Sequence, residues 1–209
     1  MMIKTNGFSL VPLECETCGA SIAAEGMDVV FYCSACHNGY RYNREKSGLI
    51  PVEVTFVSRP DLVVDLYRPF WLIPAEVRIL RREVKSKGFS GLLSGFFDTG
   101  EEASDTGSGS FAIPAFNLEI GRTIELSRRY TSELPGIDQK LGERLVGGCY
   151  DVEDAKKIAH YSIIATEVDK PDLLKNIRYE IQFGESRLLG VPFVEQAGVT
   201  MDAFFHIVI

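Results

Sequence analysis

The sequence predicts an α+β fold: a small N-terminal four-cysteine domain, then an antiparallel β-sheet body with two or three packed helices. Three observations predict this fold. Two closely spaced cysteine pairs lie near the N-terminus, strand-like alternation of apolar and polar residues occurs in the first and last thirds of the remaining chain, and helical patterns fall between them. We therefore expect a cysteine domain at residues 1–45 and an α+β body domain at residues 46–209.

The cysteine domain is predicted by two C-x2-C pairs, Cys15 with Cys18 and Cys33 with Cys36, separated by fourteen residues. Each pair supplies two thiolates from one tight turn, and two such turns facing each other close a tetrahedron of sulfur around a metal ion. Zinc is the expected ion because it prefers this coordination. Four thiolates leave no open position for water or substrate, so we expect the zinc to be structural and not catalytic.

Short strands are predicted beside the second pair, at residues 27–32 and 40–42. The order of turn, strand, turn and strand resembles the zinc-ribbon superfamily, also called rubredoxin-like, over residues 10–44. The resemblance implies metal binding and no particular function, because zinc ribbons occur in transcription, translation, transport and assembly proteins. It also implies iron as a minor alternative to zinc, since rubredoxin-like turns suit either metal.

Two other residues are candidates for metal or thiol chemistry. His37 follows Cys36 directly, but four thiolates already complete the tetrahedron, so we expect His37 to be a turn residue. Cys149 lies outside the pairs and beside two glycines, and we expect a small, buried and unreactive side chain. A ribbon of this size buries too little apolar surface to fold alone, so removal of the metal should unfold it.

The body is predicted to begin with β-structure. A hinge at residues 44–48 precedes a half-buried strand at residues 50–57, and residues 62–67 form a second extended segment. Two prolines flank the single tryptophan in residues 68–75, which restricts that segment to a strand edge or an extended turn. Strand alternation resumes at residues 76–80.

Residues 86–110 are predicted to be a flexible loop. The second half is rich in Gly, Ser and acidic residues and has too little apolar surface to be buried. The first half places large apolar residues among small ones, and these residues either pack back onto the body or form an exposed patch that binds a protein partner. They are Phe89, Leu92, Leu93, Phe96 and Phe97.

The segments 71–75 and 111–115 both have an aromatic residue followed, one residue later, by Ile-Pro-Ala, and residues 190–193 repeat the pattern weakly. This repeated pattern is either an internal duplication of one strand–turn unit or a coincidence in an apolar-rich chain. A duplication predicts that the first two segments lie in related or neighbouring strands.

Three helices are predicted in the middle of the body. The first covers residues 117–132, and the second covers residues 137–146, where apolar residues recur every fourth position before two glycines. The third, at residues 151–168, has the strongest pattern, with Asp151 as its N-cap and an apolar stripe along one face. A lone histidine on this helix, His160, is expected to be a surface or packed residue.

The C-terminal part is predicted to be β. Residues 177–183 alternate with a period of two, residues 184–186 form a hairpin turn, and residues 187–193 return antiparallel. Residues 203–209 are a predicted last strand tied into a sheet, with His206 in the core or on a sheet face.

Charge and composition exclude some classes of function. The net charge of −7 argues against a nucleic-acid binder, although residues 46–98 carry a local excess of +2. No apolar run approaches the roughly 18 residues that span a membrane, and the N-terminus lacks a signal-peptide pattern. Reduced thiolates at a metal predict a cytoplasmic protein. A candidate nucleic-acid segment consists of Arg78, Arg81, Arg82, Lys85 and Lys87.

No recognised catalytic motif occurs in the sequence, and its three histidines lie far apart. We therefore expect a non-enzymatic zinc-binding protein that acts through protein–protein contacts, as a scaffold or in assembly. An active site assembled from distant residues without a motif also stays open. Two further alternatives concern binding and redox chemistry. One is nucleic-acid binding by the ribbon and the basic segment, and the other is electron transfer with iron in the four-cysteine site.

Overall fold

The computed structural model describes residues 3–5, 8–10, 13–58, 64–85, 105–138, 144–169 and 173–209. These residues form mostly β-sheet with two helices, which agrees with the predicted α+β class. The elements are β1 (Ile3–Thr5), β2 (Phe8–Leu10), β3 (Val30–Tyr32), β4 (Gly39–Asn43), β5 (Gly48–Val52), β6 (Val54–Val57), β7 (Leu66–Lys85), β8 (Asp105–Pro114), α1 (Ile120–Ser132), β9 (Ile137–Asp138), α2 (Val152–Val168), β10 (Leu173–Phe183), β11 (Arg187–Gln196) and β12 (Val199–Asp202).

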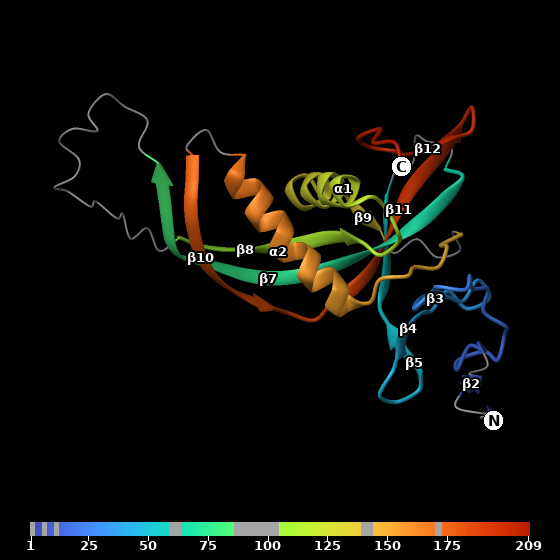
Figure 1. The fold of residues 1–209 in the computed structure, drawn as a ribbon. Helices are drawn as coiled ribbons and strands as arrows, with labels where there is room; N and C mark the ends of the chain where they lie inside the picture. Colours follow the sequence, from blue (N-terminus) through green and yellow to red (C-terminus); the bar gives the residue numbers. More distant parts are fainter. Residues whose placement is uncertain are drawn as a thin grey trace, which may run out of the picture.

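The 20-residue strand β7 is the centre of the body. It pairs antiparallel with β8 along one side and with β11 and then β10 along the other. β6 pairs parallel with β11, and β9 and β12 extend this sheet. In Figure 1, β10, β7 and β8 form a long curved arm with α2 lying across it, while β3, β4 and β5 lie at the other end of the molecule.

The predicted edge position of residues 68–75 is wrong, because these residues lie inside the central strand. Pro69 and Pro74 are tolerated there because neither position needs an N–H donor. β8 pairs with β7 only from Phe70 onward, so Pro69 lies at the end of that ladder. Pro74 lies where the other neighbour changes, between Leu72, which pairs with β11, and Ala75, which pairs with β10.

The predicted hairpin at residues 184–186 is also wrong. β10 and β11 both run antiparallel to β7 on the same side, so the chain continues past residues 184–186 and does not reverse. These three residues face only Ile73 and Pro74, which makes a bulge. The Gly184 N–H donates to the Pro74 carbonyl at 2.7 Å. The missing N–H donor of Pro74 on β7 therefore lies opposite the bulge at residues 184–186.

The Ile-Pro-Ala segments pair directly with each other. Trp71 lies opposite Ile113 and Ile73 lies opposite Phe111 in the β7–β8 register, as neighbouring strands would require if the repeated pattern is a duplication. The same pairing corrects the predicted loop, because Asp105–Ser110 belong to β8. Pairing with β7 satisfies the backbone groups on one side of this Gly/Ser segment and leaves its side chains largely exposed. The apolar group Phe89, Leu92, Leu93, Phe96 and Phe97 lies outside the described residues.

Alternate residues of β7 supply two separate hydrophobic clusters. Phe70 and Leu72 pack in one cluster with α1, through Leu126 and Tyr130. Trp71 and Ile73 pack in the other with α2 and with the ribbon. That second cluster includes Ala155, Ala159 and Val30. The middle of β7 is thus buried on both faces, which explains its nearly continuous apolar sequence.

Two of the three predicted helices are present. α1 and α2 lie within two or three residues of the predicted limits, and the Asp151 carboxylate accepts hydrogen bonds from the Glu153 and Asp154 N–H groups, as an N-cap does. The predicted helix at 137–146 is wrong: residues 137–138 are β9, and Leu145 forms a parallel bridge with Tyr67. Within the described parts of the chain, neither helix is both long and apolar enough to cross a membrane.

The sheet beside the cysteine turns contains β3, β4 and β5, so it continues across residues 44–48. β4 and β5 pair antiparallel, and the predicted hinge at residues 44–48 is the turn between them, fixed by the Asn43 side chain accepting from the Lys46 N–H at 2.7 Å. β5 therefore belongs to the ribbon sheet together with β3 and β4.

A seam at Gly147-Gly148 joins the ribbon to the body. The Gly148 carbonyl accepts from the Val29 and Val30 N–H groups, and the Gly148 N–H donates to the Val30 carbonyl. A Cβ at Gly147 would lie 2.0 Å from Asp28 Oδ2, and a Cβ at Gly148 would lie 2.7 Å from a backbone carbonyl oxygen. The two glycines, predicted as a helix stop, instead allow two chain segments to approach closely.

The C-terminal residues fold back on β12 without forming the predicted strand at 203–209. Residues 203–205 form a turn, and the Ile209 N–H donates to the Thr200 carbonyl, which ties the end of the chain to the sheet. His206 is exposed with a positive φ of 56°, so its predicted place in the core is wrong. A buried carboxylate shapes this turn: Asp202 accepts hydrogen bonds from Phe204, Phe205 and Ile207 N–H groups and from the Tyr130 hydroxyl.

Removal of this carboxylate should cost substantial stability. Asp202→Ala leaves three backbone donors and the Tyr130 hydroxyl without an acceptor in a buried site. We expect the free energy of unfolding, measured by urea denaturation, to fall by about 3 kcal/mol or more, since each buried unsatisfied donor costs about 1–3 kcal/mol. Asp65→Ala is the matched control, because the exposed Asp65 accepts one bond from the Glu195 N–H and should lose less than about 1 kcal/mol. Equal losses would contradict this role of Asp202.

Candidate metal centre

The structure brings the four predicted ligand cysteines together. The ligand atoms of Cys15, Cys18, Cys33 and Cys36 all lie within 4.8 Å of one another. The Cys15 and Cys36 sulfurs are 3.3 Å apart, and those of Cys18 and Cys33 are 3.6 Å apart. Tetrahedral bonds of about 2.3 Å place sulfurs about 3.8 Å from each other, so the group could hold one metal ion with small adjustments.

The two cysteine turns have the same backbone pattern, which explains why their sulfurs converge. In the first turn, the Gly19 N–H donates to the Cys15 carbonyl at 2.8 Å; in the second, the His37 N–H donates to the Cys33 carbonyl at 2.7 Å. Gly19 and His37 both have positive φ, 72° and 65°. The Nδ1 of His37 contacts the Tyr32 hydroxyl at 3.2 Å, and His37 is not part of the ligand group, in agreement with its predicted place in a turn.

Backbone N–H groups of both turns point at the sulfurs. Those of Thr17 and Cys18 donate to the Cys15 sulfur. The N–H groups of Ala20 and Asn38, each two residues after a cysteine, donate to the Cys18 and Cys36 sulfurs respectively. Such donors stabilise negative charge on sulfur, so the turns are built to hold thiolates.

A chain of side chains supports the Cys15 sulfur. The fully buried Tyr40 hydroxyl lies 3.0 Å from this sulfur and 3.0 Å from Thr17 Oγ1. Burial and the hydrogen bond with Cys15 raise the pKa of Tyr40, so the phenol stays protonated and donates to the thiolate. The Asn38 amide donates to Thr17 Oγ1 at 3.0 Å and to the Cys36 sulfur at 3.4 Å. Neighbours of this kind orient metal ligands and tune affinity.

The protein shifts the pKa values of Cys15 and Cys36 in opposite directions. Burial works to raise the pKa of Cys15, but the hydrogen bonds from Tyr40 and from the Cys18 N–H outweigh it and lower the pKa to about 6. Burial and the neighbouring Cys15 raise the pKa of Cys36 to about 12. Full ionisation of the group therefore requires a cation, as expected for a site that binds metal with release of protons.

Sequence reasoning identified the ligands but missed Tyr40, Thr17 and Asn38. Thr17 lies between the first two cysteines and Asn38 two residues after the last, so their nearness was visible, but their hydrogen bonds depend on how the two turns face each other. Cys149 is partly buried, and burial raises the pKa of its thiol, as expected for an unreactive cysteine. His160 packs against Phe183, with its Nδ1 3.0 Å from the Tyr179 hydroxyl.

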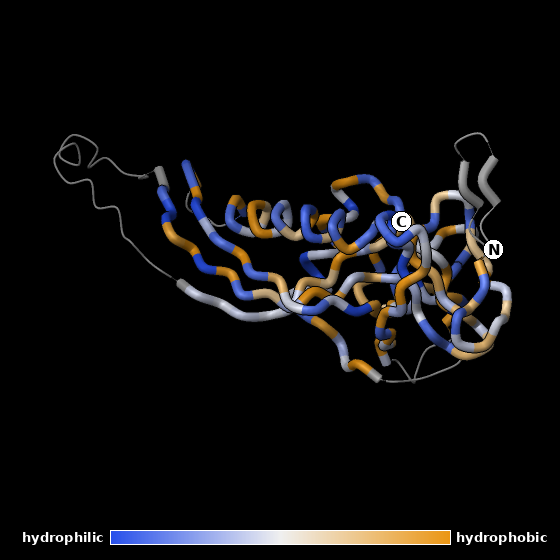
Figure 2. Tube along the Cα trace, turned by 90° about the horizontal axis from the view of Figure 1, so that it is seen from below, coloured by the Kyte–Doolittle hydropathy of each residue, from blue (hydrophilic) through white to orange (hydrophobic). Residues whose placement is uncertain are grey.

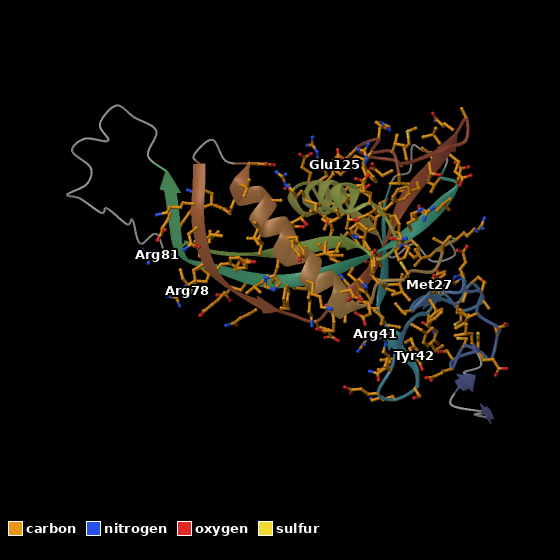
Figure 3. The ribbon with its side chains drawn as sticks, in the orientation of Figure 1. Met27, Arg41, Tyr42, Arg78, Arg81 and Glu125 are labelled. Atoms are coloured by element: carbon orange, nitrogen blue, oxygen red, sulfur yellow. The ribbon has the colours of Figure 1, made fainter. Side chains whose placement is uncertain are left out.

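The three described arginines of the predicted nucleic-acid segment do not share one surface. Arg78 and Arg81 are exposed and point away from the helices (Figure 3). Arg82 turns toward α2, where its Nε lies 2.7 Å from a carboxylate oxygen of the buried Glu167. The extra residue Leu80 in β7 interrupts strand alternation and separates these directions. Lys87 and the side chain of Lys85 lie outside the described residues.

Comparison with known proteins found no matching family model, no matching curated protein and no matching solved structure.

Loss of one ligand should abolish metal binding. We expect Cys33→Ser to lower the bound metal, measured by elemental analysis of the purified protein, from about one ion per chain to near zero, because the tetrahedron loses a ligand. Cys149→Ser is the matched control and should keep the metal. The structure adds that the Cys33→Ser body should also lose stability, because Val30 of the ribbon lies in the α2 cluster. Metal retained in Cys33→Ser would show that the ligand set is wrong.

Loss of the supporting hydroxyl should weaken metal binding without removing a ligand. Tyr40→Phe deletes the donor to the Cys15 sulfur, and we expect metal affinity to fall about tenfold in chelator competition. Tyr42→Phe, on the same strand, is the matched control and should leave the affinity unchanged. An unchanged affinity in Tyr40→Phe would mean that the Tyr40 hydrogen bond does not tune the site.

Proposed function

We propose that the chain is a non-enzymatic zinc-ribbon protein in which a structural zinc holds the ribbon against an elongated body that binds protein partners. The observation that carries the proposal is the closed ligand set. Four sulfurs from two matching turns lie close enough to complete a tetrahedron around one ion, which would leave no coordination position for substrate chemistry. The free thiols of the chain suit a reducing compartment such as the cytoplasm.

The cavity beside the ribbon and α2 fits a non-enzymatic role. One cavity of about 530 Å³ lies where β4 and β5 of the ribbon meet α2 and the bulge at residues 184–186. Its lining contains no histidine, cysteine or tyrosine, and its charges are partly paired, with Lys156 2.8 Å from Glu153 and Arg187 3.8 Å from Glu53. The lining contains Ser186 and three glutamates, but no hydrogen bond in the described residues joins Ser186 to a group that could act as its base.

Nucleic-acid binding remains the alternative. Arg78 and Arg81 on the outer face of the arm favour it, since both are exposed. Acidic neighbours oppose it: Glu180 lies across from Arg78 in the register, and Glu83 lies 2.6 Å from Arg81. Such neighbours reduce the positive potential that attracts phosphates.

Electron transfer with iron is a second alternative, because four thiolates with N–H donors suit iron as well as zinc. Purified protein distinguishes the two metals directly. A colourless protein that contains zinc agrees with the structural proposal, whereas a red protein that contains iron favours electron transfer.

Affinity capture from the native lysate tests the proposed function. We expect protein partners that survive nuclease and moderate salt, because packed protein interfaces depend little on phosphate charge. Binding through the ribbon should be lost in Cys33→Ser and retained in Cys149→Ser. Recovered nucleic acid that disappears as salt rises would favour the alternative. Capture of neither protein nor nucleic acid would contradict the proposed partner-binding role.

A further inference from the structure

The backbone groups along β7 show which groups of β8 face outward. The Pro69 carbonyl accepts from Ala115, just beyond the end of β8, whereas the Pro74 carbonyl accepts from Gly184 on the opposite side. N–H and C=O of one residue point to the same side of an antiparallel strand, and successive residues alternate. Odd-numbered residues of this part of β7 therefore face β8, and even-numbered residues face β10 and β11.

The β7–β8 register has no shift, so every odd-numbered residue of β7 lies opposite an odd-numbered residue of β8. The odd-numbered residues of β8 therefore bond to β7, and the even-numbered residues point their backbone groups outward. Gly107 and Gly109 lie opposite the odd-numbered Val77 and Ala75 and bond to β7. The residues between and beside them direct their N–H and C=O groups away from the sheet. They are Thr106, Ser108 and Ser110.

The inner end of the same edge is covered by a helix, and the outer end is open. The N–H of the even-numbered Ala112 also points away from β7, and it donates to Thr131 Oγ1 of α1 at 3.0 Å. Within the described parts of the chain, no hydrogen bond is found for the outward backbone groups of residues 106, 108 and 110. Figure 2 shows this half of β8 as a pale strand at the margin of the arm.

The two edges of the arm differ in their protection. The edge strand β10 has an extra residue, Lys175, in its pairing with β7, and it exposes Lys175, Arg178 and Glu180, features that discourage strand pairing. The open half of β8 has no irregularity, no proline and no lysine. It is therefore the edge to which another strand can add.

The sequence of this edge is complementary to itself. An antiparallel pair centred on Ser108 places Ser108 opposite its copy, Thr106 opposite Ser110, and Gly107 opposite Gly109. No charged side chain faces another within these five residues, so like charges do not oppose the pairing. A Cβ added at Gly107 or Gly109 would meet no atom within 4 Å, and neither residue has a positive φ. Nothing in the single chain therefore requires glycine at these two positions.

We propose that the open half of β8 binds a second copy of this chain, strand to strand, with a two-fold axis at Ser108. The three outward residues then form hydrogen-bonded pairs that each exchange two bonds, and the three-stranded arms join into one continuous sheet. The interface is small, so the dimer is weak and depends on concentration. The inference uses neither the metal site nor the proposed partners, and it stands or fails separately from them.

Sedimentation velocity of the zinc-loaded chain, across low to high micromolar concentrations, tests the self-pairing. We expect a reversible monomer–dimer equilibrium. Ser108→Pro removes an outward N–H from each copy but no bond to β7, and it should weaken the dimer at least about tenfold. Ser108→Ala keeps the N–H and should associate like the wild type. Circular dichroism and thermal unfolding establish that the proline variant is folded.

A charge test checks the two-fold register and does not depend on the proline variant. Thr106→Lys with Ser110→Lys places like charges opposite each other across the axis, whereas Thr106→Lys with Ser110→Asp places opposite charges there. The first pair of substitutions should weaken the dimer, and the second should restore or strengthen it. Both double variants contain Thr106→Lys, so any repulsion from Arg78, which lies opposite Thr106 on β7, is the same in the two.

Three outcomes would overturn the proposal: a wild type that is monomeric at every concentration, a dimer that Ser108→Pro leaves unchanged, or equal association of the two charge variants. A monomeric wild type whose captured protein partner is lost in Ser108→Pro, but not in Ser108→Ala, would show that the edge binds a different chain. That result would overturn self-pairing and leave the proposed partner-binding function intact.

Discussion

The pairing of β7 with strands on both sides is the constraint on which the rest of the body depends. A strand with neighbours on both edges must satisfy every backbone group, yet β7 contains two prolines. The conflict is resolved by position. Pro69 lies where β8 pairing ends, and Pro74 lies where β11 gives way to β10. The end of β8 pairing therefore matches Pro69, and the bulge at residues 184–186 matches Pro74, the two positions at which β7 has no N–H to donate.

The ribbon depends on a second constraint, the close approach at Gly147-Gly148. Through this seam β3 bonds to the body, and β3 runs directly into the second cysteine turn. Val30 contributes to the cluster under α2, and Tyr32 packs with Phe56, Tyr67 and Leu145. The candidate metal centre is thus attached to the body core through β3, and also through β5, which continues into β6 of the body after one residue. A change at the sulfurs should be transmitted to β3 first, because no longer linker separates the two parts.

The sequence predicted what local patterns decide. The cysteine ligands and α2 were found because ligand spacing and an N-cap with an apolar stripe lie within one short segment. The predicted helix at 137–146 was wrong because the apolar Leu145, which fits a helical spacing, instead pairs with Tyr67, about eighty residues away. The hairpin at 184–186 failed because a glycine-containing turn signal looks the same in a bulge. Tyr40 and Asp202 could not be assigned, since their roles depend on partners brought together by the fold.

The distribution of interactions separates the two ends of the molecule. At the end that carries the cysteines, four sulfurs lie close enough to hold one metal ion, and the seam at Gly147-Gly148 connects this part to the core. At the arm end, the α2 side of the sheet is supported by the Arg82–Glu167 ion pair and the opposite face is polar and solvated, so the described part of the arm is held by backbone pairing and side-chain packing. Because the open β8 edge lies on this second part, its backbone groups keep their direction as long as the β7–β8 register holds. Contacts made at the ribbon should therefore respond to metal, whereas contacts made at the β8 edge should respond only to changes in the edge itself.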